Sequence, residues 1–495
     1  MKFSRSSGIL MHPTSFPGRY GIGDLGPQAH RFLDFLGNSG IKLWQILPLG
    51  PTGYGDSPYQ SFSAFAGNPY LISPDILLDE NLLHPDDLSG KLDFPADNVD
   101  FGHVIGWKLN LLERAFIRFK SEPELAPVRE AYAQFCADSA NWLDDYALFM
   151  AIKEANGGGS WSDWSSELKN RDEATLAKAS TDYKDAIERF KFYQFIFFRQ
   201  WIALRAYAKE KNIQIIGDIP IFVSMDSADV WSNPELFYLD DQKLPTVVAG
   251  VPPDYFAPTG QLWGNPLYKW SVHKETGYAW WIERFQALLE MVDVVRLDHF
   301  RGFAGYWEVA ADSLTAEHGR WMPGPGADFL EALRDGLGEL PIIAEDLGEI
   351  TPDVFELRDD FNLPGMKILQ FAFSDDANPF LPHHYPENCV AYTGTHDNDT
   401  VQGWYASAPE ENRDFARRYM SVDGRDITWD LIRTLWHSKA DMVLAQMQDV
   451  LNLGTEARMN YPGRLGGNWT WRMDENALTD SLAERLHKLN EEVDR

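Results

Sequence analysis

The sequence predicts an α/β fold with a parallel sheet, and three observations point to it. Short apolar runs with strand character recur along the chain, helical patterns lie between them, and several of the runs end in an acidic residue. Alternation of strands and helices is typical of a parallel α/β sheet. The 495 residues are enough for several ordinary domains, or for one (β/α)8 barrel enlarged by insertions.

The predicted strands are short and rich in aliphatic residues. Six ranges have this character: 41–49, 213–223, 291–300, 340–348, 366–373 and 389–399. Among the helical patterns, the first has Pro27 at its first helical position and Gly37 or Gly40 at its end. The ranges 278–291 and 327–338 carry apolar residues at spacings of three and four, which indicates amphipathic helices.

Two segments interrupt the alternation of strands and helices. From about residue 76 to 200 the strand pattern disappears and amphipathic helices dominate, so a mainly helical insertion is expected there. The range 248–270 contains adjacent prolines, several glycines and several aromatic residues, so we expect a long structured loop that covers a binding site.

Charge and composition exclude several classes of partner. The chain has 44 basic and 74 acidic residues, a net charge of −30, which would repel nucleic acid and anionic membranes. A neutral substrate such as a sugar is unaffected by that field. Trp and Tyr residues near turns and carboxylates are candidates for stacking on the apolar faces of sugar rings.

Cysteine usage and hydropathy indicate the compartment. The two cysteines, Cys136 and Cys389, lie far apart and do not suggest a disulfide-stapled secreted scaffold. The first residues lack the sustained apolar core of a secretory signal, and no stretch approaches the length of a membrane span. We therefore expect a soluble, reduced, cytoplasmic protein.

The strand-like stretch 294–298 has an unusual charge pattern. Arg296 and Asp298 are two residues apart, so both charges project from the same face of a strand. Either this is an ordinary surface strand with an ion pair, or Asp298 is a catalytic carboxylate held at a strand end by its positive neighbour.

Other acidic residues stand at equivalent places. Acids at or near the ends of predicted strands are Asp218, Asp298, Glu345 and Asp397, with Asp375 slightly further along. The carboxyl ends of barrel strands converge on one mouth, where active sites of such barrels lie. Carboxylates gathered there repel one another, so their presence on separate strands favours a catalytic role.

Retaining glycosyl transfer is the chemistry that these acids fit best. No histidine set with zinc-site spacing, glycine-rich phosphate loop or Gly-x-Ser-x-Gly motif is present. A retaining mechanism needs an ionised nucleophile and a protonated acid. Asp298 beside Arg296 suits the first role, and Glu345 in an apolar run beside Asp346 suits the second. Asp397, beside His396, is suited to gripping the sugar hydroxyls.

Longer motifs give a resemblance that spans nearly the whole chain. They occupy residues 7–26, 47–73 (with "GYGDSPYQ"), 217–223 ("GDIPIFV"), 250–268, 294–303 ("VVRLDHFRGF"), 342–348 ("IIAEDLG"), 393–400 ("TGTHDNDT") and 456–469 ("EARMNYPGRLGGNW"). With these motifs the sequence resembles the amylomaltases, or 4-α-glucanotransferases, of glycoside hydrolase family 77 in the α-amylase clan. The resemblance implies one catalytic (β/α)8 unit over residues 1–495, with inserted subdomains and no C-terminal β-domain.

The resemblance also implies roles for individual residues. It makes Asp298 the nucleophile, Glu345 the general acid/base and Asp397 the stabiliser of the transition state. The substrate contacts that it implies are Tyr59, Asp218, Arg296 and His396, together with Tyr255, Phe256, Gln261, Trp263 and Asn460 in or near loops over the cleft. Tyr461 is a small departure, because a smaller residue is common at this position in the family.

The expected activity is transfer of an α-1,4-glucan segment to the 4-hydroxyl of an acceptor glucan or glucose, without a metal or another cofactor. The expected partners are α-1,4-glucans such as maltooligosaccharides, amylose or glycogen, and neither nucleic acid nor membranes. Two alternatives stay open: a retaining α-amylase-type hydrolase, and a glucan-binding protein without catalysis. The oligomeric state is not indicated by the sequence.

Overall fold

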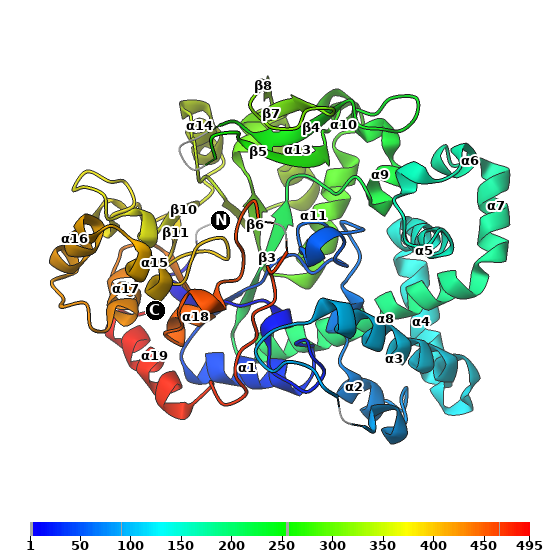
Figure 1. The fold of residues 1–495 in the computed structure, drawn as a ribbon, viewed down its shortest axis with the longest axis horizontal. Coiled ribbons are helices and arrows are strands. Elements are labelled where there is room, and N and C mark those ends of the chain that lie inside the picture. The colour runs from blue at the N-terminus through cyan, green and yellow to red at the C-terminus, as the bar shows by residue number, and fades with distance from the viewer. Residues whose placement is uncertain (1–2, 91, 254–256, 465) are drawn as a thin grey trace.

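The chain forms a closed parallel β-barrel surrounded by helices in the computed structural model, which describes residues 3–90, 92–253, 257–464 and 466–495 (Figure 1). Within these residues, eight strands follow one another around the barrel in chain order: β1 (Ser6–Leu10), β2 (Leu43–Gln45), β3 (Gln214–Pro220), β6 (Val294–Asp298), β9 (Ile342–Ala344), β10 (Gly365–Ile368), β11 (Cys389–Tyr392) and β12 (Met442–Gln446). The predicted (β/α)8 fold is confirmed.

Two barrel strands fall outside the six predicted ranges. Each of those ranges contains or overlaps one barrel strand, but β1 and β12 were not predicted. The two missing strands pair with each other in parallel, from Ser6 opposite Met442 to Leu10 opposite Gln446, and so close the barrel.

Side chains alternate between the inside and the outside of the barrel. A compact apolar cluster that includes Leu43, Ile216, Val294, Ile343 and Met366 fills the interior. Along β6, Val294 belongs to this interior cluster, whereas Val295 and Leu297 pack in the cluster outside it, as the two-residue period of a strand requires. The interior is therefore a packed core, and the polar chemistry is confined to its open end.

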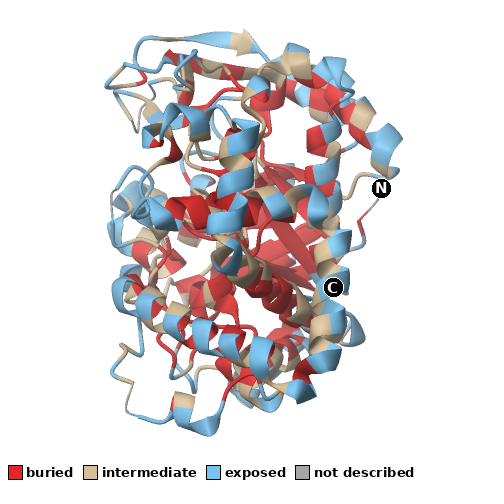
Figure 2. Ribbon diagram, turned by 90° about the vertical axis from the view of Figure 1, so that its right-hand side faces the viewer, coloured by how far each residue is buried: buried red, intermediate tan, exposed pale blue. Residues whose placement is uncertain are grey.

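Helices cover the outside of the barrel. Within the described residues they are α1 (Pro27–Asn38), α2 (Pro74–Asp79), α3 (Phe101–Ser121), α4 (Ala126–Asp138), α5 (Ala140–Ala155), α6 (Ser166–Lys169), α7 (Glu173–Asp182), α8 (Lys184–Glu210), α9 (Ala228–Ser232), α10 (Trp270–Glu275), α11 (Ala279–Met291), α12 (Arg301–Ala304), α13 (Gly326–Leu337), α14 (Pro352–Asp360), α15 (Val401–Ser407), α16 (Glu410–Met420), α17 (Ile427–Trp436), α18 (Met447–Val450) and α19 (Asp480–Glu492). Most of these helices have a buried face and an exposed outer face (Figure 2), whereas α4 and α6 have no buried residue.

The predicted helices begin and end close to their sequence signals. Helix α1 starts at Pro27 and ends at Asn38, between the two glycines that were expected to end it. Helices α11 and α13 occupy the predicted ranges with differences of one residue at their ends. Between β2 and β3 the regular elements with four or more residues are helices, and α3 to α8 lie together on one side of the barrel (Figure 1).

A second, antiparallel sheet stands beyond the barrel. Its strands are ordered β5 (Gln261–Pro266), β4 (Val247–Val251), β7 (Gly305–Ala310) and β8 (Gly319–Pro323). Strands β4 and β5 occupy part of the range 248–270, where the sequence predicted an irregular loop. Among the described residues, no helix combines the length and apolar character that crossing a bilayer requires.

Candidate active site

Arg296 lies on the inner face of β6 between two carboxylates. Its Nη1 is 2.7 Å from Oδ2 of Asp218 and 2.8 Å from Oδ1 of Asp298. Asp218 is opposite Arg296 in the register of β3 and β6, and the two-residue spacing puts Asp298 on the same face. The side chains of Asp218 and Arg296 are fully or almost fully buried, whereas that of Asp298 is 28% exposed. Asp298 therefore presents the charge of this group to the barrel mouth.

The guanidinium of Arg296 keeps its charge in this buried place. Burial disfavours the charged form, but the carboxylates of Asp218 and Asp298 outweigh burial and raise the pKa of Arg296 well above its ordinary value. Burial also disfavours the charged form of Asp218 and so raises its pKa, and Arg296 opposes that rise. Asp298 is thus ion-paired with a buried guanidinium 2.8 Å away.

Glu345 follows β9, and the residues after Asp298 hold it in place. The N–H of His299 donates to Oε2 of Glu345 at 2.8 Å, and the N–H of Leu347 donates to Oε1 at 2.9 Å. The N–H of Phe300 donates to the carbonyl oxygen of Glu345 at 3.0 Å. His299 has φ +54°, a left-handed conformation that is uncommon for residues with a Cβ and is concentrated at functional sites.

The environment of Glu345 favours its protonated form. Burial, and then the negative charge of Asp298, raise the pKa of Glu345 to about 8. Arg296 and the two N–H donors oppose this rise without cancelling it. One carboxyl group of the pair is thus held next to a positive charge, and the other is held in its acid form near neutral pH, as general acid catalysis requires.

Asp397 follows β11 and is gripped from a separate part of the chain. Nδ2 of Asn460 donates to its Oδ1 at 2.6 Å, and Nη2 of Arg458 donates to its carbonyl oxygen at 2.7 Å. Nε2 of His396 lies 3.5 Å from the same Oδ1. The side chain of Asp397 is 47% exposed, so it remains open to a ligand.

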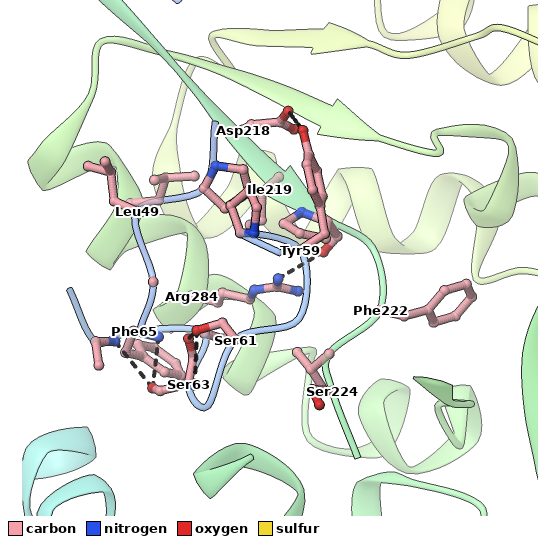
Figure 3. Close-up of a pocket in the computed structure, with 18 of the residues that line it drawn as sticks. Leu49, Tyr59, Ser61, Ser63, Phe65, Asp218, Ile219, Phe222, Ser224 and Arg284 are labelled. Atoms are coloured by element: carbon pink, nitrogen blue, oxygen red, sulfur yellow. Dashed lines mark hydrogen bonds between the residues drawn. The ribbon is translucent and has the colours of Figure 1, made fainter. Parts of the chain in front are cut away.

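Tyr59 joins the acidic group to an aromatic group. Its hydroxyl donates to Oδ2 of Asp218 at 2.7 Å (Figure 3). Its ring stacks on His396, with centroids 5.2 Å apart and planes at 20°, and lies 5.8 Å from Trp469. Burial lowers the pKa of His396, so its imidazole is neutral and can donate or accept a hydrogen bond.

A cavity of about 60 Å³ lies beside this group. Tyr59, Asp218, Phe222 and Arg284 are among the residues that line it (Figure 3). Nη2 of Arg284 donates to the carbonyl oxygen of Pro220 at 2.8 Å and so fixes the end of β3. Asp298, Glu345 and Asp397 are not part of this lining, and they lie at the barrel mouth instead.

The antiparallel sheet brings Trp263 to the site. Its ring meets the His299 ring edge-on, with centroids 4.8 Å apart, and its Nε1 donates to Oε1 of Gln261 at 3.2 Å. Both residues are on β5. Tyr255 and Phe256, also expected as substrate contacts, lie outside the described residues.

The structure brings most of the predicted site residues together and excludes one strand-end acid. Asp375 lies in an exposed turn, where its side chain accepts from the hydroxyl of Ser374 and the N–H of Ala377. The expectation that Asp375 joins the cluster is therefore wrong. His299, Arg458 and Trp469 also lie at the site, and no role for them was predicted from the sequence. The glycines that precede Trp469 could have indicated an unusual loop, and Trp469 itself has φ +65°.

Comparisons with known proteins cover almost the whole chain. The model of glycoside hydrolase family 77, described as 4-alpha-glucanotransferase, matches residues 11–479. A 4-alpha-glucanotransferase of Thermus thermophilus is 50% identical over 504 residues of alignment, which cover 100% of both chains. One from Synechocystis sp. is 49% identical over 492 residues, with 98% of this chain and 97% of the relative covered.

Solved structures give the same result. The structure described as amylomaltase from Streptococcus agalactiae in complex with acarbose has a TM-score of 0.96 and 41% identity, with 99% of each chain covered. The amylomaltase from Corynebacterium glutamicum has a TM-score of 0.79 at 18% identity, with 98% of this chain and 73% of that chain covered, which is a similarity of fold.

Proposed function

Because the chain belongs to glycoside hydrolase family 77, whose activity is that of a 4-alpha-glucanotransferase, we propose that Asp298, Glu345 and Asp397 carry out this transfer by a retaining double displacement. The family match favours the transferase over a hydrolase or a non-catalytic binder. Asp298 acts as nucleophile, Glu345 as general acid and then base, and Asp397 as stabiliser of the transition state.

The first displacement forms a covalent glycosyl-enzyme. Asp298 attacks the anomeric carbon while Glu345 gives its proton to the glycosidic oxygen, which leaves with the reducing-end fragment. The ion pair with Arg296 at 2.8 Å holds the attacking carboxylate group in place. Burial keeps the pKa of Glu345 raised, so that its proton is available near neutral pH.

The second displacement restores the α-1,4 linkage. Glu345, now a carboxylate, removes the proton from the 4-hydroxyl of an acceptor, whose oxygen attacks the anomeric carbon and releases Asp298. The N–H donors of His299 and Leu347 are directed at the two oxygens of Glu345. They stabilise the carboxylate form in which this step begins.

Asp397 and the aromatic group bind the sugar on which the reaction takes place. Asn460 fixes one carboxylate oxygen of Asp397 at 2.6 Å. The other oxygen has no hydrogen-bond partner among the described residues and can accept sugar hydroxyls. Tyr59, stacked on His396, supplies an apolar face for the pyranose ring. Arg296 and Asp218 act through Asp298 and Tyr59, to which they are bonded.

Transfer prevails over hydrolysis when an acceptor is positioned and water is kept out. Trp263 and Gln261 are carried to the site by β5, and the Trp263 ring covers His299 beside Asp298. We infer that this strand encloses the acceptor side of the cleft. The substrates are then α-1,4-glucans, with maltooligosaccharides, amylose or glycogen as donors and acceptors.

The single observation that carries this proposal is that Asp298 is paired with a buried arginine while the nearby Glu345 has a raised pKa. The test is incubation of the protein with maltotriose. Transfer gives glucose together with a ladder of longer maltooligosaccharides, hydrolysis gives shorter products alone, and a binding protein leaves the substrate unchanged. Asp298→Asn should abolish the ladder and leave the far-UV circular dichroism spectrum unchanged. Near-normal transfer by this variant would refute the assignment of Asp298.

A further inference from the structure

Arg301 is a buried arginine beside the site that the proposed mechanism does not use. It begins α12, three residues after Asp298, and is 8% exposed. Its Nη1 donates to the carbonyl oxygen of Glu349 at 2.8 Å, and its Nη2 donates to Oγ1 of Thr351 at 3.3 Å. Both acceptors belong to the segment that follows Glu345.

A tryptophan from the second sheet covers the guanidinium of Arg301. The Cζ atom of Arg301 lies 3.8 Å from the centroid of the Trp321 ring, a cation–π contact. Trp321 is on β8 and is 41% exposed. Nε of Arg301 has no hydrogen-bond partner among the described residues, so its position depends on the two Nη bonds and on this ring.

Three consecutive residues after Asp298 therefore grip Glu345 and its following segment. His299 holds the carboxyl group, Phe300 holds the carbonyl oxygen of Glu345, and Arg301 holds Glu349 four residues further on. The N–H of Leu347, which donates to Oε1 of Glu345, lies within the segment that Arg301 restrains. Asp346, the first residue of this segment, is held separately by Arg358 and by the N–H of Met366. Loss of the Arg301 contact would therefore loosen residues 347–351, and with them the N–H of Leu347 that orients the carboxyl group.

We propose that Arg301, covered by Trp321, is a positioning residue that fixes segment 347–351 and thereby aims Glu345 at the leaving oxygen. This inference rests on the proposed role of Glu345 as general acid. Arg301 itself is bonded to protein atoms and does not take part in the proton transfer.

Two glycosyl donor substrates distinguish the need for a general acid from the other requirements of the reaction. Maltotriose loses a sugar alkoxide that must be protonated, whereas α-maltotriosyl fluoride loses fluoride, which leaves without a proton. Azide as acceptor removes the need for a base in the second step. A residue that serves only to orient the acid matters for the first donor and not for the second, whereas a general loss of structure affects both.

The variants are Arg301→Lys, which keeps the charge, and Trp321→Leu, which removes the ring. We expect kcat on maltotriose to fall about 10- to 100-fold and fluoride release in azide to change less than about threefold. Glu345→Gln is the reference and should show the same selectivity more strongly. Arg485→Lys is the matched control, because Arg485 lies 3.8 Å from the ring of Trp429 on helices outside the barrel, and it should leave both rates unchanged.

The two failures can be distinguished. Suppose that Glu345→Gln loses activity on maltotriose but keeps fluoride release. If Arg301→Lys and Trp321→Leu then slow both reactions equally, or slow neither of them, Arg301 does not position the acid. If Glu345→Gln itself loses both reactions equally, the proposed role of Glu345 fails first. Should Arg301→Lys not fold, Trp321→Leu decides the question alone.

Discussion

The backbone N–H of His299 donates to Oε2 of Glu345 at 2.8 Å, so the residue that follows Asp298 holds the carboxyl group proposed to act with it. The two acids lie at the ends of neighbouring parallel strands, β6 and β9. The N–H of His299 thus reaches across the gap between these strands, and His299 itself has a left-handed conformation. The distance between nucleophile and acid is therefore set by the backbone as well as by the side chains.

The pH dependence of transfer should report the protonation of Glu345. Burial and the charge of Asp298 raise its pKa to about 8, and the first displacement needs the protonated form. We expect kcat/KM for maltotriose to fall as the pH rises through about 8, tenfold per pH unit above it. A basic limb near the ordinary pKa of a glutamate would contradict this account.

Glu345→Gln should stabilise the fold at alkaline pH although it removes activity. Because the folded-state pKa of Glu345 is raised, the unfolded chain loses this proton at a lower pH, and stability falls as the pH rises towards the folded-state pKa of about 8. We expect the variant to gain about 1–3 kcal/mol over the wild type at pH 9 and little at pH 4. Urea unfolding at the two pH values measures the gain, and an equal effect at both would refute it.

Tyr461 should influence how well water is excluded. Its ring centroid lies 4.3 and 5.2 Å from the Cζ atoms of Arg458 and Arg464. Arg458 in turn binds the carbonyl oxygen of Asp397. We expect Tyr461→Thr to raise the ratio of hydrolysis to transfer about two- to fivefold, since each such contact contributes roughly 0.5–1 kcal/mol.

Tyr461→Phe is the control for that experiment, because it keeps the ring contacts with both arginines and loses only a weak contact of the hydroxyl with the carbonyl oxygen of Thr455 at 3.4 Å. Counting new reducing ends against glucose released from maltotriose gives the ratio. If the Phe and Thr variants changed the ratio equally, the stacking of the ring would not be its cause.

Trp263→Ala should weaken acceptor use more than donor cleavage. The Trp263 ring covers His299 with centroids 4.8 Å apart, and its loss would admit water next to Asp298. We expect kcat/KM for transfer to fall about tenfold and the hydrolysed fraction to rise. Trp263→Phe should retain most of the transfer activity. An unchanged product ratio in Trp263→Ala would place the water barrier elsewhere.

The parts of the fold that the sequence predicted are those with local signals. Long aliphatic runs such as 213–223 and 291–300 correspond to β3 and β6. Strand β1 has the sequence Ser-Ser-Gly-Ile-Leu, which has too few aliphatic residues to resemble a strand, and its pairing with β12 creates the strand. Strands β4 and β5 contain glycine, and β5 ends in proline, so their pairing in the second sheet could not be distinguished from a loop.

The candidate site shows the same division. Acids at strand ends can be found in the sequence, because each follows an aliphatic run and parallel barrel strands end at one mouth. The two-residue period of a strand likewise puts Arg296 and Asp298 on one face. Asp375 has the same sequence signal and lies in an exposed turn, because the chain leaves the barrel before reaching it. Arg458 and Trp469 reach the site through a loop from the last part of the chain, and no local pattern fixes where such a loop folds back.

The most direct test of the central claim is to trap the glycosyl-enzyme. Glu345→Gln incubated with α-maltotriosyl fluoride and no acceptor should accumulate the covalent intermediate, since formation needs no acid and its breakdown lacks a base. Peptic digestion and mass spectrometry should find the maltotriosyl group on the peptide that contains Asp298. A maltotriosyl group on Asp397 or on any other residue would contradict the account.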